Sequence, residues 1–176
     1  ATPGVAAAYE RALAALPAYL SSDGYLPSGL PVLRALIAQR YAARGLPTTP
    51  EQIVITSGAL AGIAIVARAM SGPGDRIAIG SPVYSNAIES LRMGGGRLVT
   101  SPLGDALGEE GWDIEAIEAT LRQTSPRLAY LIPDFQNPTG LLMPDHTRER
   151  YARALHATRT IGIIDQALQP VQLGTQ

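Results

Sequence analysis

The sequence contains no lysine, and all 14 of its basic residues are arginine. Arginine stays protonated at neutral pH and is a poor nucleophile toward a carbonyl carbon. A reaction that requires an imine between a protein side chain and a carbonyl compound therefore cannot be completed by these residues. For such chemistry the chain supplies no catalytic side chain.

Cysteine is absent too, which excludes disulfides and thiolate metal sites and permits a cytoplasmic setting. The two histidines, His146 and His156, are too few for a metal cluster. We therefore expect a cytoplasmic protein without a metal site.

Long apolar runs are lacking as well. The apolar, uncharged run 53–67 is shorter than the ~20 apolar residues that span a bilayer, and Ser57-Gly58 and Gly62 interrupt it. No membrane span is expected. The amino end carries neither an initiator Met nor a basic segment before an apolar stretch, so no signal peptide is expected either. We expect the sequence to begin partway into a longer protein.

Neither sign of charge dominates, because the formal net charge is −1 and the isoelectric point is about 6.1. The chain therefore has no excess of positive charge that would attract nucleic acid or an anionic membrane, and it is not itself expected to bind DNA. With 46% hydrophobic and 16% charged residues, the composition is typical of a folded globular domain.

The spacing of apolar residues predicts helices and short strands in a regular order. Two helices come first, one over 5–20 that is interrupted near Pro17 and one that begins at Pro31 and ends at Arg44-Gly45. The strands expected after them are 52–56, 76–80, 97–101, 127–132 and 160–165, with helices at about 59–70, 84–93, 113–123 and 144–158 between them. These repeated βα units predict an α/β fold, a mainly parallel sheet with helices on both faces.

One loop stands out as a place for chemistry. An apolar strand ends at Pro133 and is followed by Asn137-Pro138-Thr139-Gly140, at the strand end where open α/β sheets bind ligands. Pro138 keeps Asn137 out of the helical region, so the amide of Asn137 is held in a defined direction. Asn, Pro and Gly are also the ordinary residues of turns, and a plain strand-to-helix connection is the alternative.

Three further sites follow strands, and each has two interpretations. Ser57-Gly58-Ala59-Leu60 opens a helix whose backbone N–H groups favour a phosphate, or its glycine only permits close packing. Tyr84 either stacks on a flat ligand or belongs to the core. Asp165 either caps a turn or pairs with a buried cation.

Taken in order, these segments resemble the class I/II aminotransferases, which are fold-type I enzymes that use pyridoxal 5′-phosphate. The motifs that carry the resemblance run through nearly the whole chain: Tyr25-Leu26-Pro27-Ser28-Gly29, Thr56-Ser57-Gly58-Ala59, Gly72-Pro73-Gly74-Asp75, Pro82-Val83-Tyr84, Asn137-Pro138-Thr139-Gly140 and Ile164-Asp165. Arg44-Gly45-Leu46-Pro47 and Gly111-Trp112-Asp113 look most like the aminotransferase-like domain of MocR-type regulators of the GntR family.

The resemblance implies a role for each of these residues. Ser57, Gly58, Ala59 and Leu60 would bind the cofactor phosphate, and Tyr25 would reach the phosphate of a neighbouring subunit in a homodimer. Tyr84 would stack on the pyridine ring, and Asn137 would donate a hydrogen bond to its phenolic oxygen. Asp165 would keep the ring nitrogen protonated. Gly29 would lie near the substrate carboxylate.

The chain departs from the family pattern in several places. Ala167 and Leu168 stand where relatives commonly carry a Tyr that contacts the phenolic oxygen, and Leu60-Ala61 stand where many regulators carry a Gln pair. The Schiff-base Lys and the Arg that binds the substrate carboxylate would both lie beyond Gln176. The resemblance thus implies a helical arm and cofactor/dimer segment in 1–50, a partial large domain with five of the expected strands in 51–176, and a fragment that is not catalytic alone.

Two functions from different classes agree with this resemblance. One is the ligand-sensing domain of a MocR-type transcriptional regulator, in which DNA is bound only by a separate domain. The other is a free-standing aminotransferase that moves an amino group between an amino acid and a 2-oxo acid. An unrelated doubly wound nucleotide-binding domain is a third alternative, although no G-x-G-x-x-G follows the first strand and no P-loop exists.

Overall fold

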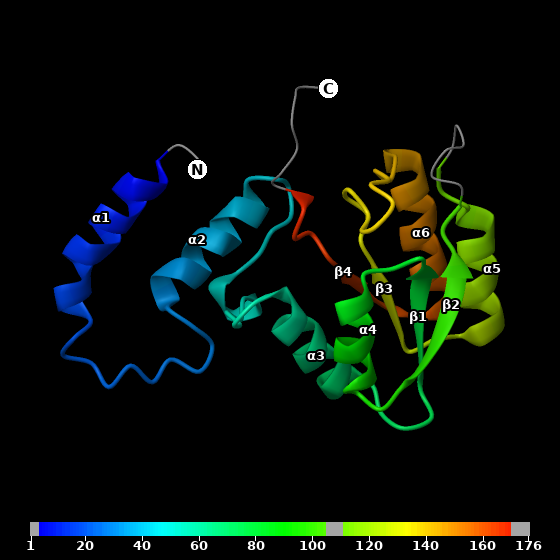
Figure 1. Ribbon diagram of the computed structural model, residues 1–176, viewed down its shortest axis with the longest axis horizontal. Helices are drawn as coiled ribbons and strands as arrows, with labels where there is room; N and C mark the ends of the chain where they lie inside the picture. Colours follow the sequence, from blue (N-terminus) through cyan, green and yellow to red (C-terminus); the bar gives the residue numbers. More distant parts are fainter. Residues whose placement is uncertain (1–3, 105–110, 170–176) are drawn as a thin grey trace. The chain divides into compact units, whose positions relative to one another are not determined.

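The computed structural model describes residues 4–104 and 111–169, and the chain divides into two compact units, Ala1–Thr56 and Ser57–Gln176. The first unit contains the helix α1 (Val5–Ala15), the 3-10 turn η1 (Leu16–Ala18), the helix α2 (Pro31–Ala42) and the 3-10 turn η2 (Pro50–Gln52) (Figure 1). None of the residues of α1 is buried.

Within the first unit, Arg34 joins α2 to η2. Its Nη2 and Nε atoms donate to the carbonyl oxygen of Pro50 at 2.7 and 3.0 Å, and Nε also donates to that of Ile53 at 2.9 Å. Gly29 packs directly against Ile55, because a Cβ atom on Gly29 would lie 2.3 Å from Cγ1 of Ile55. The segment after η2 is therefore fixed by a side chain of α2 and by a glycine contact.

The described residues of the second unit form four parallel strands in the order β2-β1-β3-β4 (Figure 1). The strands are β1 (Arg76–Ser81), β2 (Arg97–Pro102), β3 (Leu128–Leu131) and β4 (Ile161–Ile164). The helices that connect or precede them are α3 (Ala59–Met70), α4 (Ser85–Arg92), α5 (Ile114–Thr124) and α6 (Asp145–Thr158). The α/β fold with a parallel sheet that the sequence predicts is confirmed.

Alternation along the two central strands assigns the helices to opposite faces of the sheet. Ile77 and Tyr130 point into a core that also holds residues of α3 and α4, whereas Ala78 and Leu131 point into a core with residues of α5 and α6. Each face is therefore covered by a pair of helices. Fully buried side chains such as Leu91 hold these layers together, and truncation of one to alanine costs about 2–5 kcal/mol.

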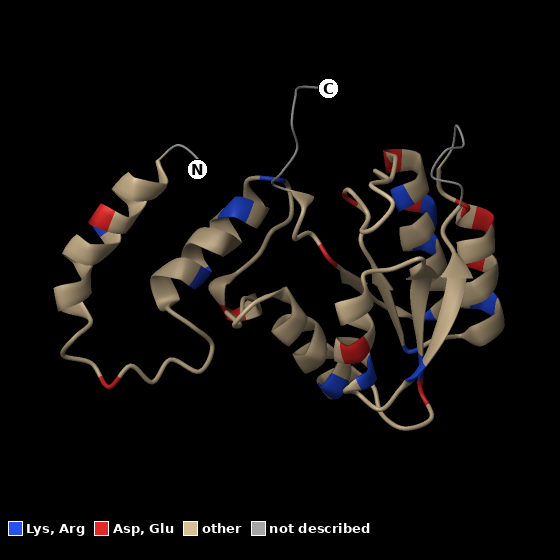
Figure 2. Cartoon of the chain, viewed as in Figure 1, with Lys and Arg blue, Asp and Glu red and all other residues tan. Residues whose placement is uncertain are grey.

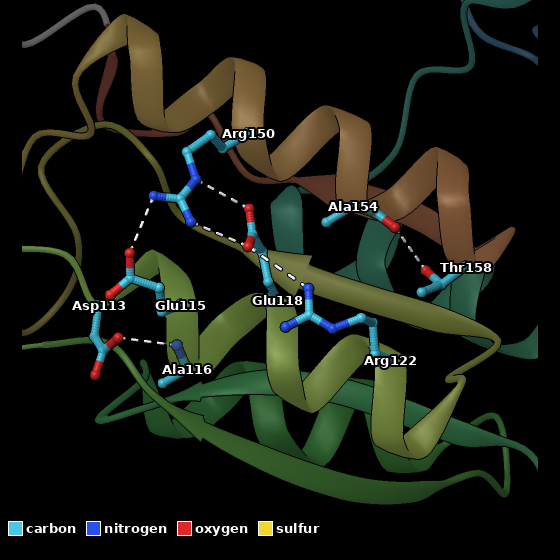
Figure 3. Close-up of polar contacts among 8 residues, drawn as sticks. All are labelled: Asp113, Glu115, Ala116, Glu118, Arg122, Arg150, Ala154 and Thr158. Carbon is cyan, nitrogen blue, oxygen red and sulfur yellow. Dashed lines mark hydrogen bonds and ion pairs between the residues drawn. The ribbon is translucent and has the colours of Figure 1, made fainter.

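Charged side chains join the two helices of the α5/α6 face (Figure 3). Arg150 of α6 donates from Nε and Nη2 to the two carboxylate oxygens of Glu118 of α5, both at 3.0 Å, and it reaches Glu115 at 3.3 Å. Arg122 lies 3.6 Å from the same Glu118 carboxylate. Asp113 caps α5, since its Oδ1 accepts from the N–H of Ala116 at 2.9 Å.

The strand expected at 52–56 is not formed. Its backbone donors are used elsewhere, because the N–H of Ile53 bonds to the carbonyl of Pro50 and the N–H of Ile55 to that of Ser28. Val54 is also exposed. The β-branched residues of this segment therefore form an extended connection, and the sheet has four strands within the described residues rather than five.

Among residues 4–104 and 111–169, no helix combines the length and apolar character that crossing a bilayer requires.

Candidate functional site

The carboxyl ends of β1, β3 and β4 bring three of the predicted residues to one edge of the sheet. Tyr84 follows β1, Asn137 follows β3 and Asp165 follows β4, and these strands are neighbours in the sheet (Figure 1). Strands lie ~4.8 Å apart, so the outer two of the three are separated by roughly 10 Å. This distance fits a single small planar ligand.

The start of α3 offers backbone donors to an anion. Gly58 is the N-cap residue with φ 138°, a backbone conformation that favours glycine, and a Cβ atom there would meet no atom within 4 Å. The N–H groups of the first helical turn, from Ala59 onward, have no partner within the helix. An exposed helix start with open space beside it can hold a phosphate.

Tyr84 is the N-cap residue of α4, and its ring is half-buried against the core under α3 and α4. Its hydroxyl oxygen accepts a hydrogen bond from Nδ2 of Asn86 at 2.8 Å. The ring is thus held by packing and by its hydroxyl, while part of it stays accessible at the edge of the sheet.

The loop after β3 is fixed from both sides. Arg148 of α6 donates from Nη2 to Oδ1 of the buried Asp134 and from Nε to the carbonyl of Met143, each at 2.8 Å. On the other side, the side chain of Gln136 is buried and bonds within the loop. Asn137 is half-buried, and its side-chain amide has no hydrogen-bond partner in the part of the chain that the structure describes.

Asp165 is held by its neighbours in a defined orientation. Its Oδ2 accepts from the hydroxyl of Tyr130 at 2.7 Å, and its Oδ1 accepts from the N–H of Ala167 at 2.9 Å. Burial raises the pKa of Tyr130 above its ordinary value, and the hydrogen bond to Asp165, its charge and the nearby Tyr84 raise it further. Tyr130 therefore stays protonated and donates. No basic side chain of the described residues forms an ion pair with Asp165.

Tyr130 and Gln136 are site residues to which sequence reasoning assigned no role. Tyr130 lies in an apolar strand and resembles any core aromatic residue, and its contact with Asp165 joins positions 35 residues apart. The alternation of side chains along β3 could have indicated its position, because it places Tyr130 on the face of the sheet that is covered by α3 and α4.

Tyr25 and Gly29 belong to the first unit. Tyr25 is 78% exposed, and its backbone N–H donates to Oδ1 of Asp23 at 3.1 Å. Gly29 has φ 94°, and its contact with Ile55 leaves no room for a side chain at this position. The roles expected for these two residues at a phosphate and a substrate carboxylate stay predictions.

The groups at the edge of the sheet in the second unit suit one kind of ligand. They comprise helix N–H donors for an anionic group, an aromatic ring for a flat face and a carboxylate for a protonated ring nitrogen. The amide of Asn137, which has no partner among the described residues, could bond to a ring oxygen. Metal ions have no comparable site, since no group of three or more His, Asp or Glu that could hold one occurs among the described residues.

Comparison with known proteins points to one family. The sequence profile of the family described as aminotransferase class I and II matches residues 10–174. The chain is 33% identical over 156 residues to the 2-aminoadipate transaminase of Thermus thermophilus, covering 89% of the chain and 36% of that protein. It is 36% identical over 124 residues to the probable rhizopine catabolism regulatory protein MocR of Rhizobium meliloti, covering 70% of the chain and 24% of that protein.

Among solved structures, α-aminoadipate aminotransferase LysN of Thermus thermophilus, complexed with N-(5′-phosphopyridoxyl)-L-leucine, superimposes with a TM-score of 0.73. The two are 32% identical, and the match covers 89% of this chain and 40% of the LysN chain. The chain thus spans about a third of the curated relatives described above, or less.

Proposed function

The chain belongs to the family of class I and II aminotransferases, and from this premise we propose that its second unit binds pyridoxal 5′-phosphate at the carboxyl edge of the sheet. The observation that carries the proposal is Asp165, a carboxylate oriented by Tyr130 and by the N–H of Ala167 but without a cationic partner among the described residues. A protonated ring nitrogen would supply that partner.

The other contacts follow from the same edge. The N–H groups at the start of α3, with Ser57 and Gly58 beside them, would bind the phosphate. Tyr84 would cover one face of the ring, and the amide of Asn137 would donate to the phenolic oxygen. The open space beside Gly58 and the absence of an intraprotein partner for the Asn137 amide in the described residues support this fit.

When bound, the cofactor would supply a ring that accepts electrons from a substrate. Asp165 would hold the proton on the ring nitrogen, and Tyr130 would hold Asp165. The half-buried ring of Tyr84 would exclude water from the covered face. The 176 residues contain no Lys, so these side chains bind and orient but form no covalent link to the cofactor.

For the protein as a whole, we propose a ligand-sensing domain of a MocR-type regulator, in which a separate domain binds DNA and an amino acid or 2-oxo acid is the small-molecule partner. The similarity to the MocR protein supports this proposal. A free-standing aminotransferase is the second candidate, because the similarity to 2-aminoadipate transaminase extends over 89% of the chain. The coding sequence before Ala1 distinguishes the two: a basic winged helix-turn-helix indicates a regulator, and a short helical arm indicates an enzyme.

Two further residues, Tyr25 and Gly29, are proposed to contact the ligands in a homodimer. Tyr25 would reach the phosphate in the neighbouring subunit, and its high exposure supports an intermolecular contact. Gly29 would lie near the substrate carboxylate. A Tyr25→Phe variant tests the first of these assignments, because it should weaken cofactor binding only under conditions in which the protein is dimeric.

The cofactor proposal is tested with pyridoxamine 5′-phosphate, which carries the ring and the phosphate but cannot form an imine with the protein. Calorimetry should show that it binds at least tenfold more tightly than inorganic phosphate, since ring contacts add to those of the phosphate. Equal affinities would contradict the proposal. With pyridoxal phosphate and borohydride, mass spectrometry should find no side-chain adduct on residues 1–176, and no transamination should occur.

A further inference from the structure

The side chain of Gln136 connects two of the loops that form the site. It is 2% exposed, and its Nε2 donates to the carbonyl of Pro82 at 3.0 Å and to that of Asn137 at 2.9 Å. Its Oε1 accepts from the N–H of Thr139 at 2.9 Å and from the Thr139 hydroxyl. The amide thus uses both its donors and both its acceptor sites on protein groups.

These bonds close the loop after β3 on itself. The backbone N–H of Gln136 also bonds to the carbonyl of Leu141 at 2.8 Å, and the N–H of Gly140 bonds to the carbonyl of Gln136. Side chain and backbone of one residue therefore hold both ends of the segment between 136 and 141. Asn137, the next residue, keeps a side-chain amide without a partner in the described residues.

The bond to Pro82 reaches beyond this loop. Pro82 follows β1 directly, and it lies two positions before Tyr84, the N-cap residue of α4. Gln136 and Pro82 are 54 residues apart in the sequence. The amide is therefore a direct connection between the loop that carries the ring-stacking residue and the loop that carries the amide donor.

We propose that Gln136 is a positioning residue that fixes Tyr84 and Asn137 relative to each other, so that both act on the same bound ring. The inference rests on the proposed binding of pyridoxal phosphate. Gln136 itself touches no ligand, because its side chain is buried and its polar atoms are used. Its effect must appear in ring binding and not in phosphate binding at α3.

The test compares two ligands on the purified protein. Gln136→Met keeps the size of the side chain and removes its hydrogen bonds, and Gln136→Glu keeps an acceptor for Thr139 while removing both amide donors. Affinity for pyridoxamine 5′-phosphate should fall about tenfold in each variant, whereas that for inorganic phosphate should stay within about twofold. If one variant does not fold, as judged by circular dichroism, the other decides.

Thr160→Val is the matched control. The hydroxyl of the buried Thr160 donates to the carbonyl of Pro126 at 3.0 Å, so this variant also removes a buried bond to a backbone carbonyl, but at the opposite edge of the sheet. It should leave the affinities for both ligands unchanged. An equal loss for both ligands in the Gln136 variants would show a general effect on folding and would overturn the proposal.

A mutant cycle shows whether Gln136 acts through its two neighbours. In a protein that already carries Tyr84→Ala and Asn137→Ala, the change Gln136→Met should have no further effect on pyridoxamine phosphate binding. A full additional tenfold loss in that background would overturn the proposal. A wild-type protein that binds pyridoxamine phosphate no better than phosphate would instead refute the proposed function, and the inference with it.

Discussion

The two edges of the parallel sheet use polar groups in opposite ways. At the amino edge, helix carbonyls meet arginine side chains: Nη1 of Arg76 donates to the carbonyl of Thr124, the last residue of α5, at 2.8 Å. Nε of Arg127 donates to the carbonyl of Met70, the last residue of α3, at 3.1 Å. Figure 2 shows basic ribbon segments at this end of the strands. Polar groups there have partners within the protein.

At the carboxyl edge, some polar groups have no such partner among the residues that the structure describes. The amide of Asn137 has none in the described residues, and the first N–H groups of α3 have none within their helix. The difference follows from topology, because a βα connection brings helix starts with free N–H groups to the carboxyl ends of the strands and helix ends with free carbonyls to the amino ends. One edge therefore contributes to stability, and the other is the edge where we propose that the cofactor binds.

Asp165→Asn should give the largest effect and should confine it to binding. The amide keeps one oxygen for the Tyr130 hydroxyl, loses the acceptor for the exposed N–H of Ala167, and removes the charge opposite a protonated ring nitrogen. A hydrogen bond between charged groups contributes about 1.5–3 kcal/mol, so affinity for pyridoxamine phosphate should fall roughly tenfold to a hundredfold. Calorimetry measures the affinity, and urea unfolding serves as the control for stability.

An unchanged affinity in Asp165→Asn would remove Asp165 from the site and would break the contrast between the edges. Asn137→Ala, on the same edge, provides a second measurement with a smaller expected loss, because a neutral hydrogen bond contributes about 0.5–1.5 kcal/mol.

Thr160→Val should have the opposite profile. Thr160 is buried at the amino edge, and the substitution leaves the carbonyl of Pro126 without its side-chain donor. An unsatisfied buried group costs about 1–3 kcal/mol, so the free energy of unfolding in urea should fall by about that amount while pyridoxamine phosphate affinity stays the same. A loss of affinity without a loss of stability would contradict the division of roles.

The order of helices and strands in the second unit could be predicted from the sequence because it depends on local periodicity. The cap at Asp113 was predictable for the same reason, since donor and acceptor lie three residues apart. The segment 52–56 shows the limit of local pattern. Its β-branched residues favour a strand, but the N–H of Ile55 bonds to the carbonyl of Ser28, which lies in a loop distant in the sequence.

In the site, too, local sequence pattern predicts some residues and contacts between distant segments determine the others. Asn137 and Asp165 stand at the ends of predicted strands, so sequence alone placed them at one edge of the sheet. The partners that orient the site were not predictable, because Tyr130 meets Asp165 only since β3 and β4 are neighbours in the sheet. Gln136 reaches Pro82 across β3 and β1 in the same way. Strand order decides these contacts, and periodicity does not encode it.

The ion pairs between α5 and α6 should give the smallest effect (Figure 3). Hydrogen bonding to Arg150 is the main cause of a lowered pKa of Glu118, and the charges of Arg150 and Arg122 lower it further. Because the pKa is lower in the folded than in the unfolded state, the ion pairs stabilise the fold above the ordinary glutamate pKa. This contribution is lost as the pH falls through the lowered value.

Glu118→Gln should therefore reduce the free energy of unfolding at pH 7 by less than about 1 kcal/mol, since the arginines are partly solvent-exposed. The difference from wild type should shrink as urea unfolding is repeated at lower pH, and it should also shrink in high salt. Pyridoxamine phosphate affinity should not change, because the pair joins the two helices on one face of the sheet, whereas Tyr84 and Tyr130 pack on the other face. A difference in unfolding free energy that grows at acid pH would mean that the protonated carboxyl group of Glu118 stabilises the fold, and not its ion pair with Arg150.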